Sequence, residues 1–179
     1  MKTLFAAVFV LGAALLFILT PAKADPLKVG DAAPQVVGTT ETGLKVNLGD
    51  IYKQQAYTLV YFYPRAGTHG CTLQGCSLRD AYEALTKNGV AVVGVSTDTV
   101  AAQAKFKNDQ HFPFTLIADP DKTVISAFGV PTRSIPVIGQ IATRQAYLIK
   151  NGKIVWADYK ASTEKQAADV LKVIGQMKS

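Results

Sequence analysis

The only two cysteines of the chain, Cys71 and Cys76, lie five residues apart. Cys71 stands where a buried apolar segment ending at Tyr63 is expected to give way, after a short loop, to a helix. A thiol at that point lies beside the unpaired N–H groups and the positive end of the helix dipole, both of which stabilise a thiolate. The thiolate is the nucleophilic form of cysteine. The pair therefore offers a candidate nucleophile and a second sulfur that can close a disulfide on it.

Other functions of a cysteine pair have to be weighed against this one. Exported proteins often use two cysteines as a structural disulfide. If both residues are helical, their Cα atoms lie roughly 8.6 Å apart, whereas a disulfide needs them within about 7 Å. His69 and His111 are the only histidines, and they form no four-ligand pattern with the cysteines, so we expect no metal. The residues alone leave the structural and the redox interpretation open.

The segment 1–24 has the features of a secretory signal peptide. Lys2 precedes an apolar, uncharged run at 4–19, and Ala22-Lys23-Ala24 matches the small-x-small cleavage pattern, with Asp25 as the expected mature start. The apolar run is shorter than the ~20 residues of a typical membrane span, which favours a signal peptide over an uncleaved anchor. We therefore expect an exported, periplasmic protein without stable membrane association after cleavage.

Cleavage would leave residues 25–179, enough for a single domain with a sizeable core. The formal net charge would fall from +6 to +4, because two lysines and no acidic residues leave with the signal. The mature chain is mildly basic, but it has no run of lysine and arginine and no basic patch interleaved with aromatic residues. Nucleic acid is therefore not expected as a partner.

Strands and helices are expected to alternate along the mature chain. The apolar and aromatic run at 57–63 predicts a buried strand. The β-branched run at 90–96 predicts a central parallel strand. Residues 71–87 are expected to be helical up to a stop at Asn88-Gly89, and Thr163 with Gln166 fits a capping box for a last helix that reaches Met177. This order predicts an α/β fold with helices on both faces of a sheet. The other expected elements are a hairpin (35–39 and 44–48), a helix from 99 to 108, a strand (114–118), a short helix (123–128) and a hairpin (145–150 and 153–157).

The longest expected loop covers 130–143, a segment without clear periodicity that contains two prolines and a glycine. Arg133 lies inside it and Arg144 follows directly. Long loops often carry binding and catalytic residues. From the local sequence alone, however, Arg144 would be interpreted as an ordinary surface arginine.

Several short motifs together resemble one known family. Phe62-Tyr63-Pro64 followed by Thr68-x-x-Cys71-Thr72 is similar to the peroxiredoxin motif Pro-x-x-x-Thr-x-x-Cys, and Cys76 matches the bacterioferritin comigratory protein, or peroxiredoxin Q, branch. The resemblance covers essentially the whole mature chain. Its other carriers are Val29-Gly30-Asp31-x-Ala33-Pro34, Gly94-Val95-Ser96-x-Asp98, Leu116-Ile117-Ala118-Asp119 and Arg144-x-x-Tyr147-Leu148-Ile149.

The resemblance implies a thioredoxin-like (peroxiredoxin) fold and assigns roles to five residues. Cys71 would be the peroxidatic cysteine and Cys76 the resolving one. Thr68 would hydrogen-bond the thiolate and the peroxide, and Pro64 would shield the thiolate from bulk water. Arg144 would hold the thiolate and stabilise the negative charge that develops on the departing oxygen, a task suited to a fixed guanidinium.

The implied activity is that of a thiol-dependent peroxidase acting on hydrogen peroxide and organic hydroperoxides. Cys71 would become a sulfenic acid, and Cys76 would condense with it to an intramolecular disulfide. A thioredoxin-like thiol reductant would then restore both thiols. No metal or organic cofactor is needed, and we expect a monomer or a weak homodimer.

Two rival functions are compatible with the same fold. A thiol-disulfide oxidoreductase normally uses Cys-x-x-Cys, which this chain lacks. A non-enzymatic binding domain with a structural disulfide would resist mild reductants and lose stability when the disulfide is removed. Peroxide consumption measured against insulin reduction separates a peroxidase from the thiol-disulfide oxidoreductase.

Some residues depart from the branch or carry further expectations. The branch commonly has acidic residues where Ala66-Gly67 stand and a proline where His69 stands, which bears on the flexibility of this loop and on the redox partner. Arg79 is a weaker candidate for a charge at the site and is expected to pair with Asp80 or Asp50 instead. Disulfide formation is expected to unwind 71–76, and Gly75 is expected to ease this, because glycine costs about 1 kcal/mol relative to alanine in a helix.

Overall fold

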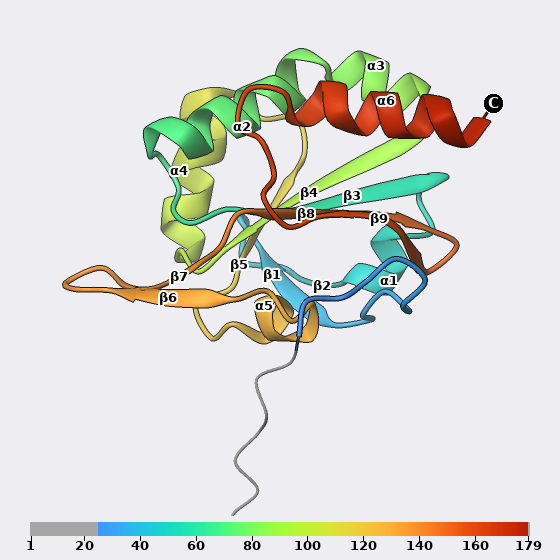
Figure 1. Cartoon of the computed structure of the whole chain (residues 1–179). Helices are drawn as coiled ribbons and strands as arrows, with labels where there is room; N and C mark the ends of the chain where they lie inside the picture. The colour runs from blue at the N-terminus through green and yellow to red at the C-terminus, as the bar shows by residue number, and fades with distance from the viewer. Residues whose placement is uncertain (1–24, 179) are drawn as a thin grey trace, which may run out of the picture.

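The computed structural model describes residues 25–178, so the expected signal segment 1–24 lies outside the described part of the chain. A seven-stranded mixed sheet runs through the molecule (Figure 1). Its strands are β1 (Val37–Thr40), β2 (Lys45–Asn47), β3 (Tyr57–Phe62), β4 (Val90–Ser96), β5 (Thr115–Ala118), β8 (Gln145–Lys150) and β9 (Lys153–Asp158). They are arranged in the order β2-β1-β5-β4-β3-β8-β9.

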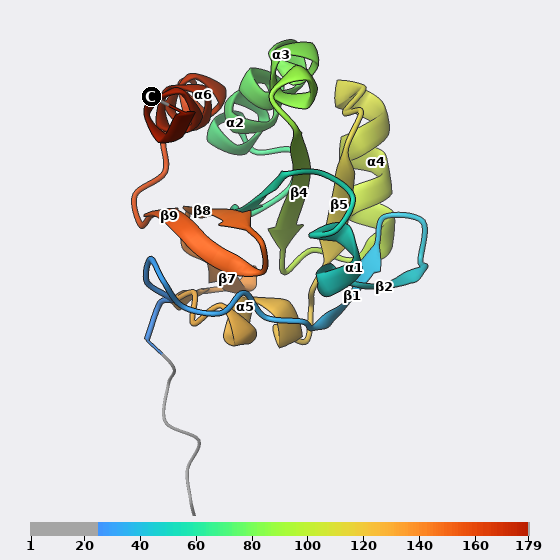
Figure 2. The ribbon, with the colours of Figure 1, turned by 90° about the vertical axis from the view of Figure 1, so that its right-hand side faces the viewer.

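Helices cover both faces of this sheet, as the sequence predicts. They are α1 (Leu48–Ile51), α2 (His69–Asp80), α3 (Tyr82–Lys87), α4 (Val100–Gln110), α5 (Thr123–Ala127) and α6 (Gln166–Lys178). Helices α2, α3, α4 and α6 lie on one face, and α1 and α5 lie on the other (Figures 1 and 2). None of the helices within residues 25–178 combines the length and the apolar character needed to cross a membrane.

The two hydrophobic cores follow from the alternation of side chains along buried strands. In β3, Leu59 and Tyr61 point into the core beneath α2, α3 and α6, whereas Val60 and Phe62 point into the core beneath α1 and α5. Successive residues of a strand face opposite sides of the sheet. Because both sides are covered by helices, all six residues of the strand are buried, and it does not alternate between apolar and polar residues.

Strand directions bring the ends of three strands to one edge of the sheet. β3, β4 and β5 are parallel, while β8 runs antiparallel to β3, with Phe62 opposite Gln145. The carboxyl ends of β3 and β4 therefore lie beside the start of β8. The residues that directly follow β3 and β4, and the residue that precedes β8, are thus gathered at one place.

The prediction of a long loop at 130–143 was wrong. The segment forms a two-stranded hairpin, β6 (Thr132–Ile135) and β7 (Gly139–Ala142), that extends away from the body of the molecule (Figure 1). Most of its residues are exposed, so the strands show no apolar alternation. Its turn also lacks the usual glycine signal: Val137 has a φ of 69°, a conformation that glycine or asparagine usually provides.

Two helix boundaries also differ from the prediction. The helix expected at 71–87 begins earlier, at His69, and is broken at Ala81, where φ is −99° and ψ is 11°. No glycine or proline marks this break in the sequence. The capping box of Thr163 and Gln166 was wrong as well, because α6 begins only at Gln166 and the amide of that side chain bonds Gln74 of α2. The Gln166 side chain, which the local pattern assigned to the capping box, therefore bonds a residue of another helix instead.

Candidate active site

Cys71 lies in the first turn of α2, at the edge of the sheet where β3 ends. Thr68 precedes the helix in an extended conformation, and its carbonyl oxygen accepts the first intrahelical bond, from Thr72 N at 2.9 Å. Cys71 therefore stands among the first-turn N–H groups that have no intrahelical partner. Its side chain is buried, with only 1% of its surface exposed.

Arg144 reaches this buried thiol from the start of β8. Its Nη2 donates to Cys71 Sγ at 3.3 Å, and its Nη1 donates to Gln74 Oε1. No ion pair of the described residues involves Arg144, so its charge is not neutralised by a carboxylate there. The guanidinium therefore meets one neutral amide and the sulfur, and no carboxylate of residues 25–178 competes for it.

Thr68 and Pro64 precede Cys71 in the chain, and neither makes a hydrogen bond to it. The Thr68 hydroxyl donates to Arg65 O at 2.9 Å, and Pro64 is half-buried, two residues after the end of β3. A hydroxyl has a single proton to donate, so Thr68 would have to rotate to donate to the thiolate or to a peroxide. The roles expected for both residues stay predictions.

Cys76 lies on the same helix as Cys71 and is half-buried. Its Sγ lies 3.7 Å from Gln110 Oε1 at the end of α4, and Arg79 donates to Gln110 O at 2.8 Å. Arg79 pairs with Asp80, as expected, and this hydrogen bond raises the pKa of Arg79. Its charge is thus already engaged, unlike that of the arginine beside Cys71.

Both cysteines are free thiols within one continuous helix. Residues five apart on a regular helix have Cα atoms roughly 8.6 Å apart, beyond the reach of a disulfide. A bond between the two sulfurs therefore requires α2 to open. The static structural disulfide is not formed in this conformation.

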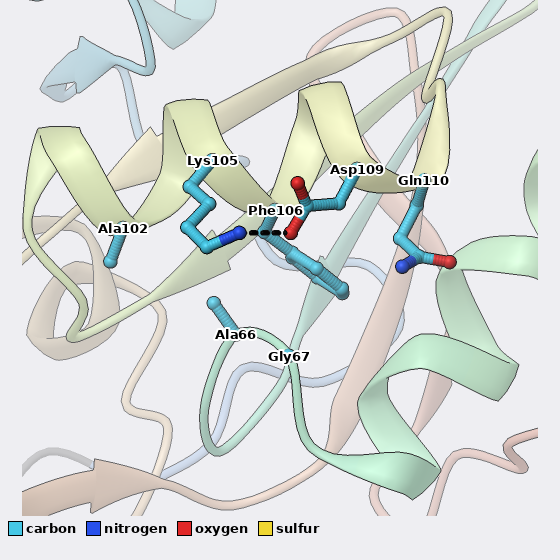
Figure 3. Close-up of a pocket in the computed structure, with 7 residues that line it drawn as sticks. All are labelled: Ala66, Gly67, Ala102, Lys105, Phe106, Asp109 and Gln110. Carbon is cyan, nitrogen blue, oxygen red and sulfur yellow. Dashed lines mark hydrogen bonds and ion pairs between the residues drawn. The ribbon is translucent and has the colours of Figure 1, made fainter.

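A pocket of about 250 Å³ lies between the Ala66–Gly67 loop and α4 (Figure 3). Phe106 lines it, Lys105 and Asp109 form an ion pair of 2.7 Å at its side, and Gln110 closes one end. Since Gln110 also contacts Cys76 Sγ, the pocket lies directly beside the second cysteine.

The buried surroundings of Cys71 include uncharged tyrosines. Burial raises the pKa of Tyr61 and of Tyr63 well above the usual value, so both hydroxyls stay protonated. Among residues 25–178, no group of three or more histidine, cysteine, aspartate or glutamate side chains is placed to hold a metal ion. The ionic partner nearest to the thiol is therefore a guanidinium.

Comparison with known proteins gives the family. Residues 29–157 match the AhpC/TSA family. The chain belongs to this family. Peroxiredoxin Bcp of Escherichia coli (strain K12) is 45% identical over 106 residues, which cover 59% of this chain and 67% of the relative. Peroxiredoxin Q, chloroplastic, of Oryza sativa subsp. japonica is 35% identical over 147 residues, or 81% of this chain and 65% of the relative.

A solved structure agrees with these sequence relatives. The crystal structure of peroxidoxin BcpB from Mycobacterium tuberculosis matches with a TM-score of 0.78 and 28% identity, covering 86% of this chain and 99% of that chain. The thioredoxin-like fold and the bacterioferritin comigratory protein / peroxiredoxin Q branch expected from the motifs are confirmed. The chain is a peroxiredoxin and hence a thiol-dependent peroxidase.

Three polar residues at the site of this peroxiredoxin were not predicted to be site residues from the sequence. Asp98 follows β4, and its Oδ2 accepts from Ala66 N and from Ser96 Oγ, each at 2.7 Å, which ties down the loop ahead of Cys71. Asp98 could have been predicted from its position after β4, because the carboxyl ends of parallel strands lie at the same edge of a sheet. Gln74 lies three residues beyond Cys71, a spacing that puts both on one helix face. Gln166 comes from a distant helix, and nothing local to it points to the site.

The structure reverses the expectation for Gly75. This residue is buried against Phe112, and a Cβ added to it would lie 2.3 Å from Phe112 Cζ. Phe112 is itself fixed by a stacked contact with Phe114 and an edge contact with Phe106. A glycine is thus needed at this position for α2 to pack closely against Phe112. This packing explains the glycine without assigning it a role in the opening of α2.

We expect Gly75→Ala to destabilise the peroxiredoxin and to speed disulfide formation. Overpacking costs about 1–3 kcal/mol, which exceeds the gain of about 1 kcal/mol from helix propensity. Thermal unfolding and the rate of disulfide formation measure the effect. Phe112→Leu removes the ring atoms that an alanine would meet, so in that background Gly75→Ala should instead stabilise the helix. The same destabilisation in both backgrounds would refute the packing explanation.

Proposed function

We propose that Cys71 is the peroxidatic cysteine of this peroxidase and that Arg144 activates it. The observation that carries the proposal is a guanidinium 3.3 Å from a buried sulfur, with no carboxylate partner among residues 25–178. The Cys71 thiolate attacks one peroxide oxygen, the O–O bond breaks, and the electron pair leaves with the second oxygen. That oxygen takes up a proton and departs as water or an alcohol, while Cys71 becomes a sulfenic acid.

Cys76 then resolves the sulfenic acid. Its sulfur attacks Cys71 Sγ, the S–O bond breaks, and water leaves as the intramolecular disulfide forms. A thioredoxin-like dithiol reduces this disulfide by thiol exchange and is itself oxidised. The location of both cysteines on one helix supports a resolving step that is coupled to the opening of α2.

Stopped-flow mixing of the reduced protein, residues 25–179, with hydrogen peroxide tests the proposal. We expect rapid consumption of one equivalent of peroxide and continued turnover once a thioredoxin-like reductant is added. Insulin reduction serves as the contrasting assay, because a thiol-disulfide oxidoreductase would be active there instead. Failure to consume peroxide, together with a disulfide that resists mild reductants, would favour a structural disulfide.

Disulfide formation should melt the start of α2. We expect oxidation to lower the far-UV helical signal and to raise amide hydrogen exchange across residues 70–78, because these residues lose their helical bonds. Exchange in α4 should stay close to that of the reduced form and provides an internal reference. Equal protection of 70–78 in the two redox states would contradict the opening of the helix.

We also propose that the protein is exported to the periplasm and that Ala24 ends its signal peptide. The support is the charged start, apolar run and Ala-x-Ala pattern of residues 1–24. We expect protein purified from the cell envelope to have the mass of a chain that starts at Asp25, as measured by intact-mass spectrometry. A mass that includes Met1 would instead indicate an uncleaved anchor.

A further inference from the structure

A chain of hydrogen bonds leads from Cys71 to the C-terminal helix. Arg144 bonds both Cys71 Sγ and Gln74 Oε1. Gln74 Nε2 then donates to Gln166 Oε1 at 2.8 Å. Gln166 is the first residue of α6, so the residue that precedes β8 and residues of α2 and α6 are joined in one network around the thiol.

The polarity of this network fixes the orientation of both amides. A guanidinium can only donate hydrogen bonds, so Gln74 must turn its oxygen to Arg144 and its nitrogen to Gln166. Gln166 must in turn offer its oxygen. Both glutamines are fully buried, so neither amide can flip without leaving buried groups unsatisfied.

The nitrogen of the Gln166 side-chain amide has no hydrogen-bond partner in the described part of the chain. This atom, Nε2, is buried. A buried unpaired donor is unfavourable, and an apolar side chain of similar shape would avoid it. What the amide adds at this position is therefore its oxygen, as the acceptor for Gln74.

We propose that Gln166 is a positioning residue for peroxide attack, acting through Gln74 on Arg144. Gln166 holds the Gln74 amide in the orientation that receives Arg144 Nη1, and the second nitrogen of the same planar fork is then aimed at Cys71 Sγ. The inference rests on the proposed function and extends its site to α6.

The hydrogen bond between Gln74 and Gln166 should speed the attack on peroxide but slow disulfide formation. Gln74 lies between Cys71 and Cys76, inside the segment that must unwind to form the disulfide. The Gln74–Gln166 bond therefore has to break when α2 opens. Removing Gln166 should slow the attack on peroxide and speed disulfide formation, a pair of effects that a loss of folding alone does not produce.

The α2–α6 interface supplies a matched control. Ser77 Oγ accepts from Ala167 N at 3.2 Å, one residue along α6 from Gln166. Within residues 25–178, the Ser77 side chain makes no hydrogen bond to Arg144 or Gln74. Ser77→Ala therefore loosens the docking of α2 on α6 without disturbing the guanidinium. It should speed disulfide formation and leave the attack within about twofold of the wild-type rate.

The experiment compares three replacements of Gln166 with this control. Gln166→Met keeps the volume and helix propensity but removes the acceptor, and Gln166→Leu is a second apolar variant in case one fails to fold. We expect either to slow the first attack about tenfold, which corresponds to roughly 1.4 kcal/mol of activation free energy. Gln166→Glu offers an accepting oxygen whether or not it is protonated and should restore most of the rate.

Stopped-flow fluorescence or absorbance separates the attack from disulfide formation, and thermal unfolding confirms that each variant is folded. Wild-type attack rates in the folded Gln166→Met and Gln166→Leu variants would overturn the inference. So would equal slowing in Ser77→Ala, because docking of the helices would then explain the effect. A wild-type protein that does not attack peroxide would overturn the proposed function itself, which distinguishes the two failures.

Discussion

Cys71→Ser is expected to abolish peroxide consumption, including the first turnover. A serine hydroxyl is far less acidic than a thiol and is not converted to a nucleophile by a nearby guanidinium. The two side chains have nearly the same shape, so this buried position should keep its packing. Stopped-flow measurement of peroxide against protein concentration should show only the background rate.

Cys76→Ser is the contrasting variant, because the two cysteines have different surroundings. Cys71 is buried beside a guanidinium that has no carboxylate partner in the described part of the chain. Cys76 contacts a neutral glutamine and lies near an arginine paired with Asp80. We expect this variant to consume one equivalent of peroxide at the wild-type rate and then stall. Mass spectrometry should find one or more added oxygen atoms on Cys71. Equal loss of the first turnover in both variants would contradict the assignment of roles.

The elements predicted best were those whose local sequence shows a clear apolar pattern or a capping residue. The 90–96 strand is β4, with identical bounds, and Thr99 caps α4 by accepting from Ala102 N. In these segments the local pattern and the tertiary environment agree. The hairpin of β6 and β7 was missed for the opposite reason: its strands are largely exposed, and its turn places a valine where a glycine is usual.

Only those site residues that belong to local sequence motifs could be predicted from the sequence. Cys71 was found from its place between a strand and a helix, and Arg144 from a family motif. Their proximity comes from the antiparallel pairing of β8 with β3, which no local pattern specifies. Gln166 and the packing of Gly75 against Phe112 depend on side chains far apart in the sequence. Helix propensity alone therefore leaves out the packing contact that we expect to govern the effect of Gly75→Ala.

Arg144→Lys is expected to slow the attack on peroxide strongly while the fold is kept. The guanidinium bonds Cys71 Sγ with one nitrogen and Gln74 Oε1 with the other. A lysine has a single ammonium nitrogen and cannot hold both partners in this planar geometry. It also cannot place a fixed donor where charge develops on the departing oxygen. Loss of such a donor typically lowers the rate about 10²–10³-fold, and we expect an effect of that order.

Arg133→Lys provides the matched control, because Arg133 lies exposed on β6 in the same segment of the chain. It should react with peroxide at the wild-type rate. Stopped-flow rates of the first attack, measured for both variants at one pH and ionic strength, give the comparison, and circular dichroism checks the fold. If Arg144→Lys reacted normally and Arg133→Lys slowly, the hairpin would have to supply the catalytic charge, and the short contact between Arg144 and Cys71 would have no role in the attack.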